Sequence, residues 1–136
     1  MIRPLCWKLR QNPQQSRDGN AMPSPFAQLQ ENLGGDWDET KTVVGLFFES
    51  AQEQLQHLRA AQQHADAARL AYAAHQLAGA AGTCGLDQLS TTLRDLEQLA
   101  TTTTDSSAWS ETLEAADREI NRIRQAWNET LHVQDT

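Results

Sequence analysis

Apolar side chains recur at helical spacing in five segments of the chain after residue 23. The first segment is short, because Phe26, Leu29 and Leu33 share one face before Gly34 and Gly35 interrupt the pattern. The four longer stripes extend from residue 36 or 38 to 62, from 66 to 84, from 86 to 100 and from 107 to 131. This periodicity, in a chain rich in alanine, leucine, glutamine and glutamate, predicts an all-α protein.

Residues that favour helix ends lie between these segments. The polar residues suited to N-caps are Ser24, which Pro25 follows, Asp36 or Asp38, Asp66 and Ser107. Gly85 can end the third segment, and residues 101–107, mostly threonine and serine, suit a loop. Because short loops place consecutive helices side by side, we expect an up-and-down antiparallel four-helix bundle with a short extra N-terminal helix.

A length of 136 residues suits a single domain. Residues 1–23 lack helical periodicity, so we expect a disordered leader or linker there and a helical bundle domain at residues 24–132. Residues 1–23 contain four of the 11 basic residues and one of the 18 acidic residues, which leaves the rest of the chain with a net charge of −10. An acidic domain repels nucleic acids and anionic membranes, so the expected partner is a protein with a basic surface.

The cysteines and the hydropathy pattern bear on the compartment. Cys6 and Cys84 lie in unrelated contexts and form no disulfide framework, which fits a reducing environment. No apolar run approaches the roughly 20 residues of a membrane span, and the N-terminus lacks the apolar segment of a signal peptide. We expect a cytoplasmic protein, or the cytoplasmic end of a membrane-anchored one, without direct membrane contact.

The third apolar stripe leaves His75 on the opposite side of its helix. The stripe consists of Leu70, Leu77, Ala81 and Cys84, and His75 lies roughly 140° from its centre. The residues expected beside His75, which we name the predicted docking face, are Ala71, Gln76, Ala78, Gly79 and Gly82. Glycine inside a helix costs about 1 kcal/mol relative to alanine, and two glycines on an exposed face gain no packing in return. We therefore predict that another molecule approaches this face closely.

An exposed imidazole is a suitable acceptor for a phosphoryl group. A neutral histidine has a free nitrogen lone pair at cellular pH. Phosphoryl transfer depends mainly on positioning and charge neutralisation, so a partner that brings Mg²⁺ and carboxylates needs only a well-placed nucleophile from this chain. Two other interpretations fit the spacing: His75 is an ordinary surface histidine, or the small residues mark close packing of two helices.

The stretch from Ala74 to Leu86, AHQLAGAAGTCGL, resembles the signature of the histidine-containing phosphotransfer (HPt) domains of bacterial phosphorelays and chemotaxis kinases. Further similarity occurs at residues 34–36, 46–49, 89, 93 and 96–97, and the resemblance covers about residues 26–131. It implies a four-helix bundle whose exposed histidine receives phosphate from a receiver-domain aspartate or a kinase and passes it to another receiver. It also implies a phosphoryl carrier rather than an enzyme, with no cofactor of its own and Mg²⁺ on the partner receiver domain.

The resemblance assigns roles to individual residues. His75 matches the phosphorylated histidine, and Gly79 matches the glycine that opens space beside it. Gly85 and Leu86 match the turn into the next helix. The sequence departs from the family pattern three residues after the histidine, where members commonly have a lysine and this chain has Ala78. That source of charge support for a phosphoryl group is therefore missing.

Glu97 follows His75 by 22 residues. In a hairpin that turns near Gly85, both residues lie about 14 to 18 Å from the turn, at about 1.5 Å per residue. In the chemotaxis kinases a glutamate at this position interacts with the histidine, so the resemblance implies that Glu97 orients the His75 ring. The other interpretation is an ion pair between Glu97 and Arg94, three residues earlier on the same helix.

Other candidate residues have simpler explanations. His57 and His64 are seven residues apart, but no cysteine or carboxylate completes a metal-ligand set, so no metal site is expected. Cys84 falls on the apolar stripe and is predicted to be a small buried hydrophobe rather than a nucleophile. Trp109 and Trp127 are predicted to pack in the core.

Two functional hypotheses follow. The first is a phosphotransfer module that relays a phosphoryl group between receiver-domain aspartates, either as the terminal domain of a hybrid sensor kinase or as a freestanding protein. Its expected partners are response-regulator receiver domains and a histidine kinase core in the same polypeptide, and the isolated domain is expected to be a monomer. The alternative is an HPt-like interaction bundle that docks a receiver or kinase domain without efficient transfer, and Ala78 is its evidence.

Overall fold

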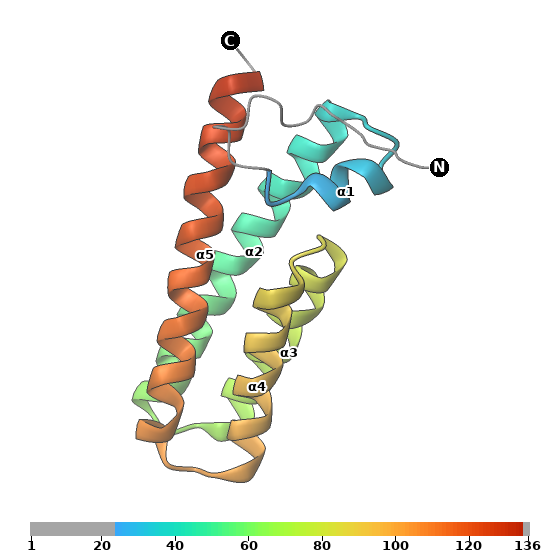
Figure 1. Ribbon diagram of the computed structural model, residues 1–136. Helices are drawn as coiled ribbons and strands as arrows, with labels where there is room; N and C mark the ends of the chain where they lie inside the picture. Colours follow the sequence, from blue (N-terminus) through green and yellow to red (C-terminus); the bar gives the residue numbers. More distant parts are fainter. Residues whose placement is uncertain (1–23, 135–136) are drawn as a thin grey trace, which may run out of the picture.

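The computed structural model describes residues 24–134, which form five α-helices and no β-strand (Figure 1). The helices are α1 (Ala27–Asn32), α2 (Trp37–Gln63), α3 (Ala67–Thr83), α4 (Asp87–Thr102) and α5 (Ser106–Gln134). The prediction of an all-α protein is confirmed. The leader expected at residues 1–23 lies outside the described residues, and the domain boundaries stay a prediction. Among the described residues, no helix is both long enough and apolar enough to cross a membrane.

Two aspartates begin helices where their spacing predicts. The Asp36 carboxylate accepts a hydrogen bond of 3.0 Å from the Glu39 backbone N–H at the start of α2. At the start of α3, the Asp66 carboxylate accepts one of 3.1 Å from the Arg69 backbone N–H. Each carboxylate satisfies an N–H group that helix geometry leaves without a partner inside the helix.

The predicted start of the first helix is wrong. The α1 helix begins at Ala27, and the Ser24 hydroxyl accepts a hydrogen bond of 3.1 Å from the Phe26 backbone N–H in the turn that precedes it. The serine therefore stabilises this turn through a contact two residues ahead rather than capping the helix. The end of the segment agrees with the prediction, because Leu33, Gly34 and Gly35 follow the last residue of α1.

The predicted loop before the fifth helix is also wrong in its bounds and its cap. The α4 helix continues to Thr102 and α5 begins at Ser106, so only residues 103–105 connect them. Ser107 lies within the first turn of α5. The Asp105 carboxylate accepts hydrogen bonds from the Ser107 hydroxyl at 2.7 Å and from its backbone N–H at 3.0 Å. These two bonds hold the pKa of Asp105 below its ordinary value, and the bond from the hydroxyl has the larger effect.

A tight turn at Gly85 joins α3 to α4. The backbone of Gly85 has φ = +79°, a conformation that residues other than glycine rarely adopt. The Leu86 N–H donates to the Ala81 carbonyl at 2.8 Å, and the Gly85 N–H donates to the Gly82 carbonyl at 3.1 Å. This pair of bonds is the Schellman arrangement that ends many helices. The turn reverses the chain, so α4 runs back along α3 (Figure 1).

The chain also reverses direction after α2 and after α4, and helices that are neighbours in sequence lie side by side (Figure 1). The contact between α3 and α4 is the most extensive, and α2 packs against α3 while α5 packs against both α4 and α2. The side chains between these helices are mostly leucine, isoleucine and alanine; those without exposed surface include Leu58, Leu70, Leu89, Leu96 and Ile120. Burial of such side chains is the main source of stability for this fold.

Aromatic residues gather where α1 meets α2 and α5. Phe26 is fully buried, and its ring centroid lies 5.3 Å from that of Trp127 and 6.0 Å from that of Phe47. The ring of Trp37 lies 5.4 Å from that of Trp127. Trp109, at the start of α5, is fully buried as well. The prediction that Trp109 and Trp127 pack in the core is confirmed.

Candidate functional site

His75 lies on the solvent-facing side of α3. Its side chain is 62% exposed. On the opposite side of the helix, Leu70, Leu77 and Ala81 have no exposed surface and Cys84 has 4%. The predicted orientation of α3 is therefore confirmed for both its core stripe and its histidine.

The Glu97 side chain reaches His75 from α4. Its two carboxylate oxygens lie 3.2 and 3.3 Å from the His75 Nδ1 atom. Because an ionised carboxylate only accepts hydrogen bonds, this contact requires a proton on Nδ1, and in the neutral ring it leaves the lone pair on Nε2. Within residues 24–134, the Glu97 carboxylate contacts His75 and forms no ion pair with Arg94. The contact that the resemblance implied is present.

The glycines of α3 have no packing role inside the domain. A Cβ atom placed on Gly79 would meet no other atom within 4 Å. A Cβ atom on Gly82 would meet the Ser90 Oγ atom at 3.5 Å, which is an ordinary contact. Close helix packing therefore does not explain Gly79, although glycine lowers helix stability at this exposed position. The glycine at position 79 is instead consistent with the close approach of another molecule to this surface.

Ala78 does not belong on the predicted docking face. Its side chain is fully buried, and its backbone carbonyl accepts a hydrogen bond of 3.0 Å from the Ser90 hydroxyl of α4. The residue lies about 60° around the helix from His75, on the side that α4 covers. Ala71 is half-buried and packs against the core, whereas Gln76, Gly79 and Gly82 are exposed. The open part of the predicted docking face is thus formed by the last three residues.

Tyr72 is an exposed aromatic residue that the sequence analysis did not single out. It lies one turn before His75 on α3, and 65% of its surface is exposed. Spacing could have identified it, because residues three apart on a helix share a face. An aromatic side chain left in solvent one turn from the histidine is a ready contact for a protein partner.

Leu46 on α2 is the second apolar residue that the sequence analysis missed, with 59% of its surface exposed. Its position follows from the contact between His57 of α2 and Arg69 of α3. The Arg69 Nη2 atom donates to the His57 Nδ1 atom at 2.9 Å. Since the two helices run in opposite directions, Leu46 and Ala80, each 11 residues from that contact, lie at the same height. Eleven residues make about three turns, so Leu46 lies on the same face of α2 as His57.

The remaining candidate residues have structural roles. Arg69 reaches His57 of α2 and so does not add a positive charge beside His75. Residues 24–134 contain no group of three or more histidine, cysteine or acidic side chains that could hold a metal ion. Cys84 is a free, buried thiol, and burial raises its pKa, which suppresses the reactive thiolate. Its prediction as a small buried hydrophobe is confirmed.

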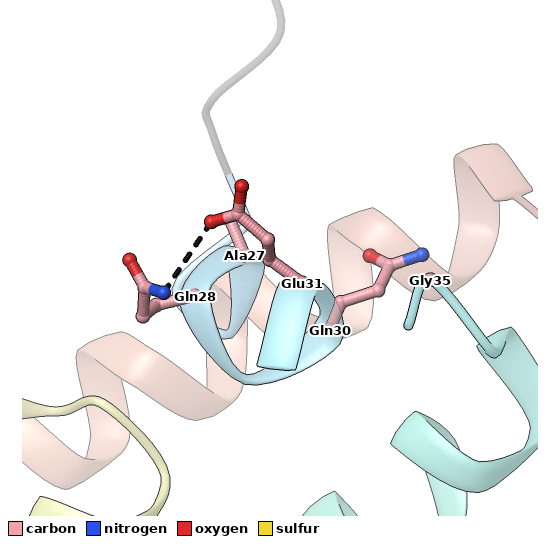
Figure 2. A pocket seen from close by; sticks show the side chains of 5 residues that line it. All are labelled: Ala27, Gln28, Gln30, Glu31 and Gly35. Atoms are coloured by element: carbon pink, nitrogen blue, oxygen red, sulfur yellow. Dashed lines mark hydrogen bonds between the residues drawn. The ribbon is translucent and has the colours of Figure 1, made fainter. Parts of the chain in front are cut away.

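Two surface hollows lie away from His75. Figure 2 shows a shallow one on α1, lined by Ala27, Gln28, Gln30, Glu31 and Gly35. Within it, the Gln28 amide donates to the Glu31 carboxylate at 3.3 Å. A second hollow lies between the start of α4 and α5. Neither includes a residue of α3, and His75, with 62% of its side chain exposed, lies on the surface of the domain.

Comparison with known proteins agrees with this geometry. The family model described as Hpt domain matches residues 42–126, which is more than half of the chain and includes both His75 and Glu97. No curated protein and no solved structure matched the chain. Hpt domains are phosphoryl carriers of phosphorelays rather than catalysts, and the exposed histidine with its carboxylate partner suits that chemistry. The chain belongs to the Hpt domain family.

Proposed function

We propose that this chain relays a phosphoryl group between the aspartates of receiver domains in a two-component phosphorelay, with His75 as the acceptor. The observation that supports this most strongly is the exposed His75 ring with Nδ1 against the Glu97 carboxylate. Gly79 leaves open space one turn away on the same helix. A nucleophile whose free nitrogen faces solvent beside a bare helix surface is accessible to the phosphorylated aspartate of a second protein.

The proposed reaction uses the Nε2 lone pair of His75. Nε2 attacks phosphorus of the partner's acyl phosphate, the new N–P bond forms, and the P–O bond to the aspartate breaks so that the aspartate leaves as a carboxylate. The attack places positive charge on the imidazole ring. The Glu97 carboxylate, 3.2 Å from Nδ1, stabilises that charge and keeps the proton on Nδ1. Transfer to the next receiver reverses these steps.

The partner receiver domain is proposed to supply the remaining groups. Receiver aspartates bind Mg²⁺, which would neutralise the phosphoryl oxygens during transfer. We propose no cofactor on this chain. Position 78, where many family members have a lysine, contributes no charge here because alanine is uncharged, and its methyl group is buried. The neutralising charge is therefore expected from the partner alone.

The proposed receiver-docking surface combines the exposed part of the predicted docking face with two apolar residues. Gln76 and the two glycines provide a low surface around His75, and Tyr72 and Leu46 provide exposed apolar area on α3 and α2. Apolar groups at the centre of a small interface suit a transient signalling contact. We expect charged groups at the edge to affect mainly the rate of encounter.

The finer architecture belongs to the same proposal. We propose that α2 to α5 form an up-and-down antiparallel four-helix bundle with α1 as the extra N-terminal helix, a monomeric domain spanning residues 24–132. The helix contacts and the alternating chain directions support it. We further propose a cytoplasmic setting, either as the terminal domain of a hybrid sensor kinase that also contains a histidine kinase core or as a freestanding relay protein. The free Cys84 thiol is compatible with a reducing compartment.

A transfer screen tests the proposed function. Receiver domains from the source genome are phosphorylated with labelled acetyl phosphate, purified and mixed one by one with this chain. We expect at least one receiver to transfer label to the chain as an acid-labile, base-stable phosphohistidine, and the labelled chain to pass it to a second receiver. If receivers bind the chain but none transfers label in either direction, the proposal is wrong and the interaction-bundle alternative holds.

A further inference from the structure

Ser90 is unusual among the polar residues of this domain. Within the described part of the chain, the buried polar residues are Thr40 and Ser90. The Thr40 hydroxyl donates to the Asp36 carbonyl in the first turn of its own helix. The Ser90 hydroxyl instead leaves α4 and donates to the Ala78 carbonyl of α3 at 3.0 Å. This bond is buried and joins two helices.

The helix surface that receives this bond offers little shape for alignment. From residue 78 to residue 82, α3 consists of Ala-Gly-Ala-Ala-Gly. Small side chains bring two helices together but form shallow ridges, so they resist sliding less than interlocking leucines do. A hydrogen bond requires a donor–acceptor distance near 3 Å and a narrow range of angles. Beside residues 78–82, the hydrogen bond from Ser90 to Ala78 is therefore the contact best able to set the position of α4 along α3.

The same two helices hold His75 and Glu97. Ala78 lies one turn after His75 on α3, and Ser90 lies seven residues before Glu97 on α4. Seven residues are close to two full turns, so Ser90 and Glu97 face α3 from the same side of α4. The contact between Glu97 and the His75 Nδ1 atom is 3.2 Å and lies at an exposed surface, where water competes for both groups. Its geometry depends on how α4 is placed.

We propose that Ser90 is a positioning residue for phosphoryl transfer. Its bond to the Ala78 carbonyl sets the height of α4 against α3, and this places the Glu97 carboxylate where it holds the proton on the Nδ1 atom of His75. The Nε2 lone pair then faces the incoming phosphoryl group. Ser90 touches neither the histidine nor the phosphoryl group. The inference rests on the proposed acceptor role of His75 but can be measured without any transfer reaction.

The first test measures the tautomer of His75. The ¹⁵N chemical shifts of the imidazole show which nitrogen has the proton in the neutral ring. We expect the Nδ1–H form to predominate in the natural protein and to decrease in Ser90→Ala, as it does in Glu97→Ala, toward the Nε2–H form that an unconstrained histidine prefers. Thr92→Ala is the matched control, because the Thr92 hydroxyl donates to the Gln88 carbonyl of its own helix.

The second test measures transfer from a phosphorylated receiver domain. We expect Ser90→Ala to slow the transfer about three- to tenfold at saturating receiver, with Thr92→Ala unchanged. If Ser90→Ala and Thr92→Ala leave the tautomer and the rate equally unaffected, Ser90 has only a structural role and the inference is overturned. If Ser90→Ala fails to fold, Ser90→Cys, which keeps the size but is a weaker donor, gives the same comparison. If Ser90→Ala lowers the population of the Nδ1–H form but the natural protein shows no transfer, the proposed function fails while the positioning of Glu97 by Ser90 stands.

Discussion

The end of the molecule covered by α1 and the pair formed by α3 and α4, both visible in Figure 1, are packed with different kinds of side chain. At the first, contacts between aromatic rings connect five residues, namely Phe26, Trp37, Phe47, Phe48 and Trp127. In α3 and α4 Tyr72 is the single aromatic residue, and it is exposed. Large rings bury much apolar area with few residues. The α3–α4 pair relies instead on alanine, leucine and one serine.

This difference separates stability from function. Small residues let α3 and α4 lie close together. On the outer face of α3 they also leave a surface around His75 without large projecting side chains, which a second protein can approach. Rings of the size of Trp127 would fill that space if they occurred on the outer face of α3. We therefore expect substitutions at the α1 end to change mainly stability, and substitutions on the outer face of α3 to change mainly transfer.

The largest expected effect is complete loss of transfer in His75→Gln. Glutamine has no nitrogen lone pair that can accept a phosphoryl group, so labelling from a phosphorylated receiver should vanish. The free energy of unfolding should change by less than about 0.5 kcal/mol, because the side chain lies outside the core. His132→Gln, an exposed substitution on α5, is the control and should label normally. Acid-labile label that persists in His75→Gln would show that another histidine is the acceptor.

Next is Gly79→Leu, which should slow transfer by more than about 100-fold because the added side chain holds the receiver away from His75. A Cβ atom here meets no atom within 4 Å beyond the neighbouring backbone of its own helix, and leucine favours a helix by about 1 kcal/mol over glycine, so the protein should melt at the same temperature or higher. Ala108→Leu adds leucine at an exposed position of α5 and should transfer normally. A variant of Gly79 that melts normally and transfers at the natural rate would contradict the docking role.

Phe26→Ala tests the other region and should lower the free energy of unfolding by about 3–5 kcal/mol, measured by urea titration. Phe26 has no exposed surface, and its removal leaves a cavity among Phe47, Phe48 and Trp127. Leu46→Ala is the matched comparison, since it deletes an exposed apolar side chain and should cost less than about 0.5 kcal/mol while slowing transfer. If Phe26→Ala and Leu46→Ala lower the free energy of unfolding equally, the α1 end and the proposed receiver-docking surface do not differ in their contribution to stability.

The smallest expected effect is an increase of about 0.5–1 kcal/mol in the free energy of unfolding of Ala65→Gly. Ala65 is the middle residue of the connection from α2 to α3 and has φ = 53°, where the Cβ atom is strained by about 1–2 kcal/mol. Glycine removes this strain and loses part of the gain to its greater freedom in the unfolded chain. Urea titration measures the change, and transfer should be unaffected. A loss of stability would show that the alanine is not strained there.

The helix starts show how far local sequence predicts this fold. Asp36 and Asp66 begin α2 and α3 as expected, because capping depends on a side chain and an N–H group only three residues apart. At α5 the same reasoning selected Ser107, but Asp105 accepts the hydrogen bonds. Serine and aspartate are both suitable acceptors near a helix start. Which one is used depends on where the preceding loop places the first turn.

The sequence by itself determined that α3 presents His75 to solvent and that Gly85 turns the chain. Both follow from helical periodicity and from the backbone freedom of glycine, which are local properties. Only the tertiary structure decided that Ala78 is buried while Gly79 is open, and that Ser90 and Glu97 reach α3. These relations join residues 12 and 22 positions apart, and they depend on the side from which α4 packs against α3. A helical period defines a face, but the neighbouring helix determines which edge of that face remains exposed.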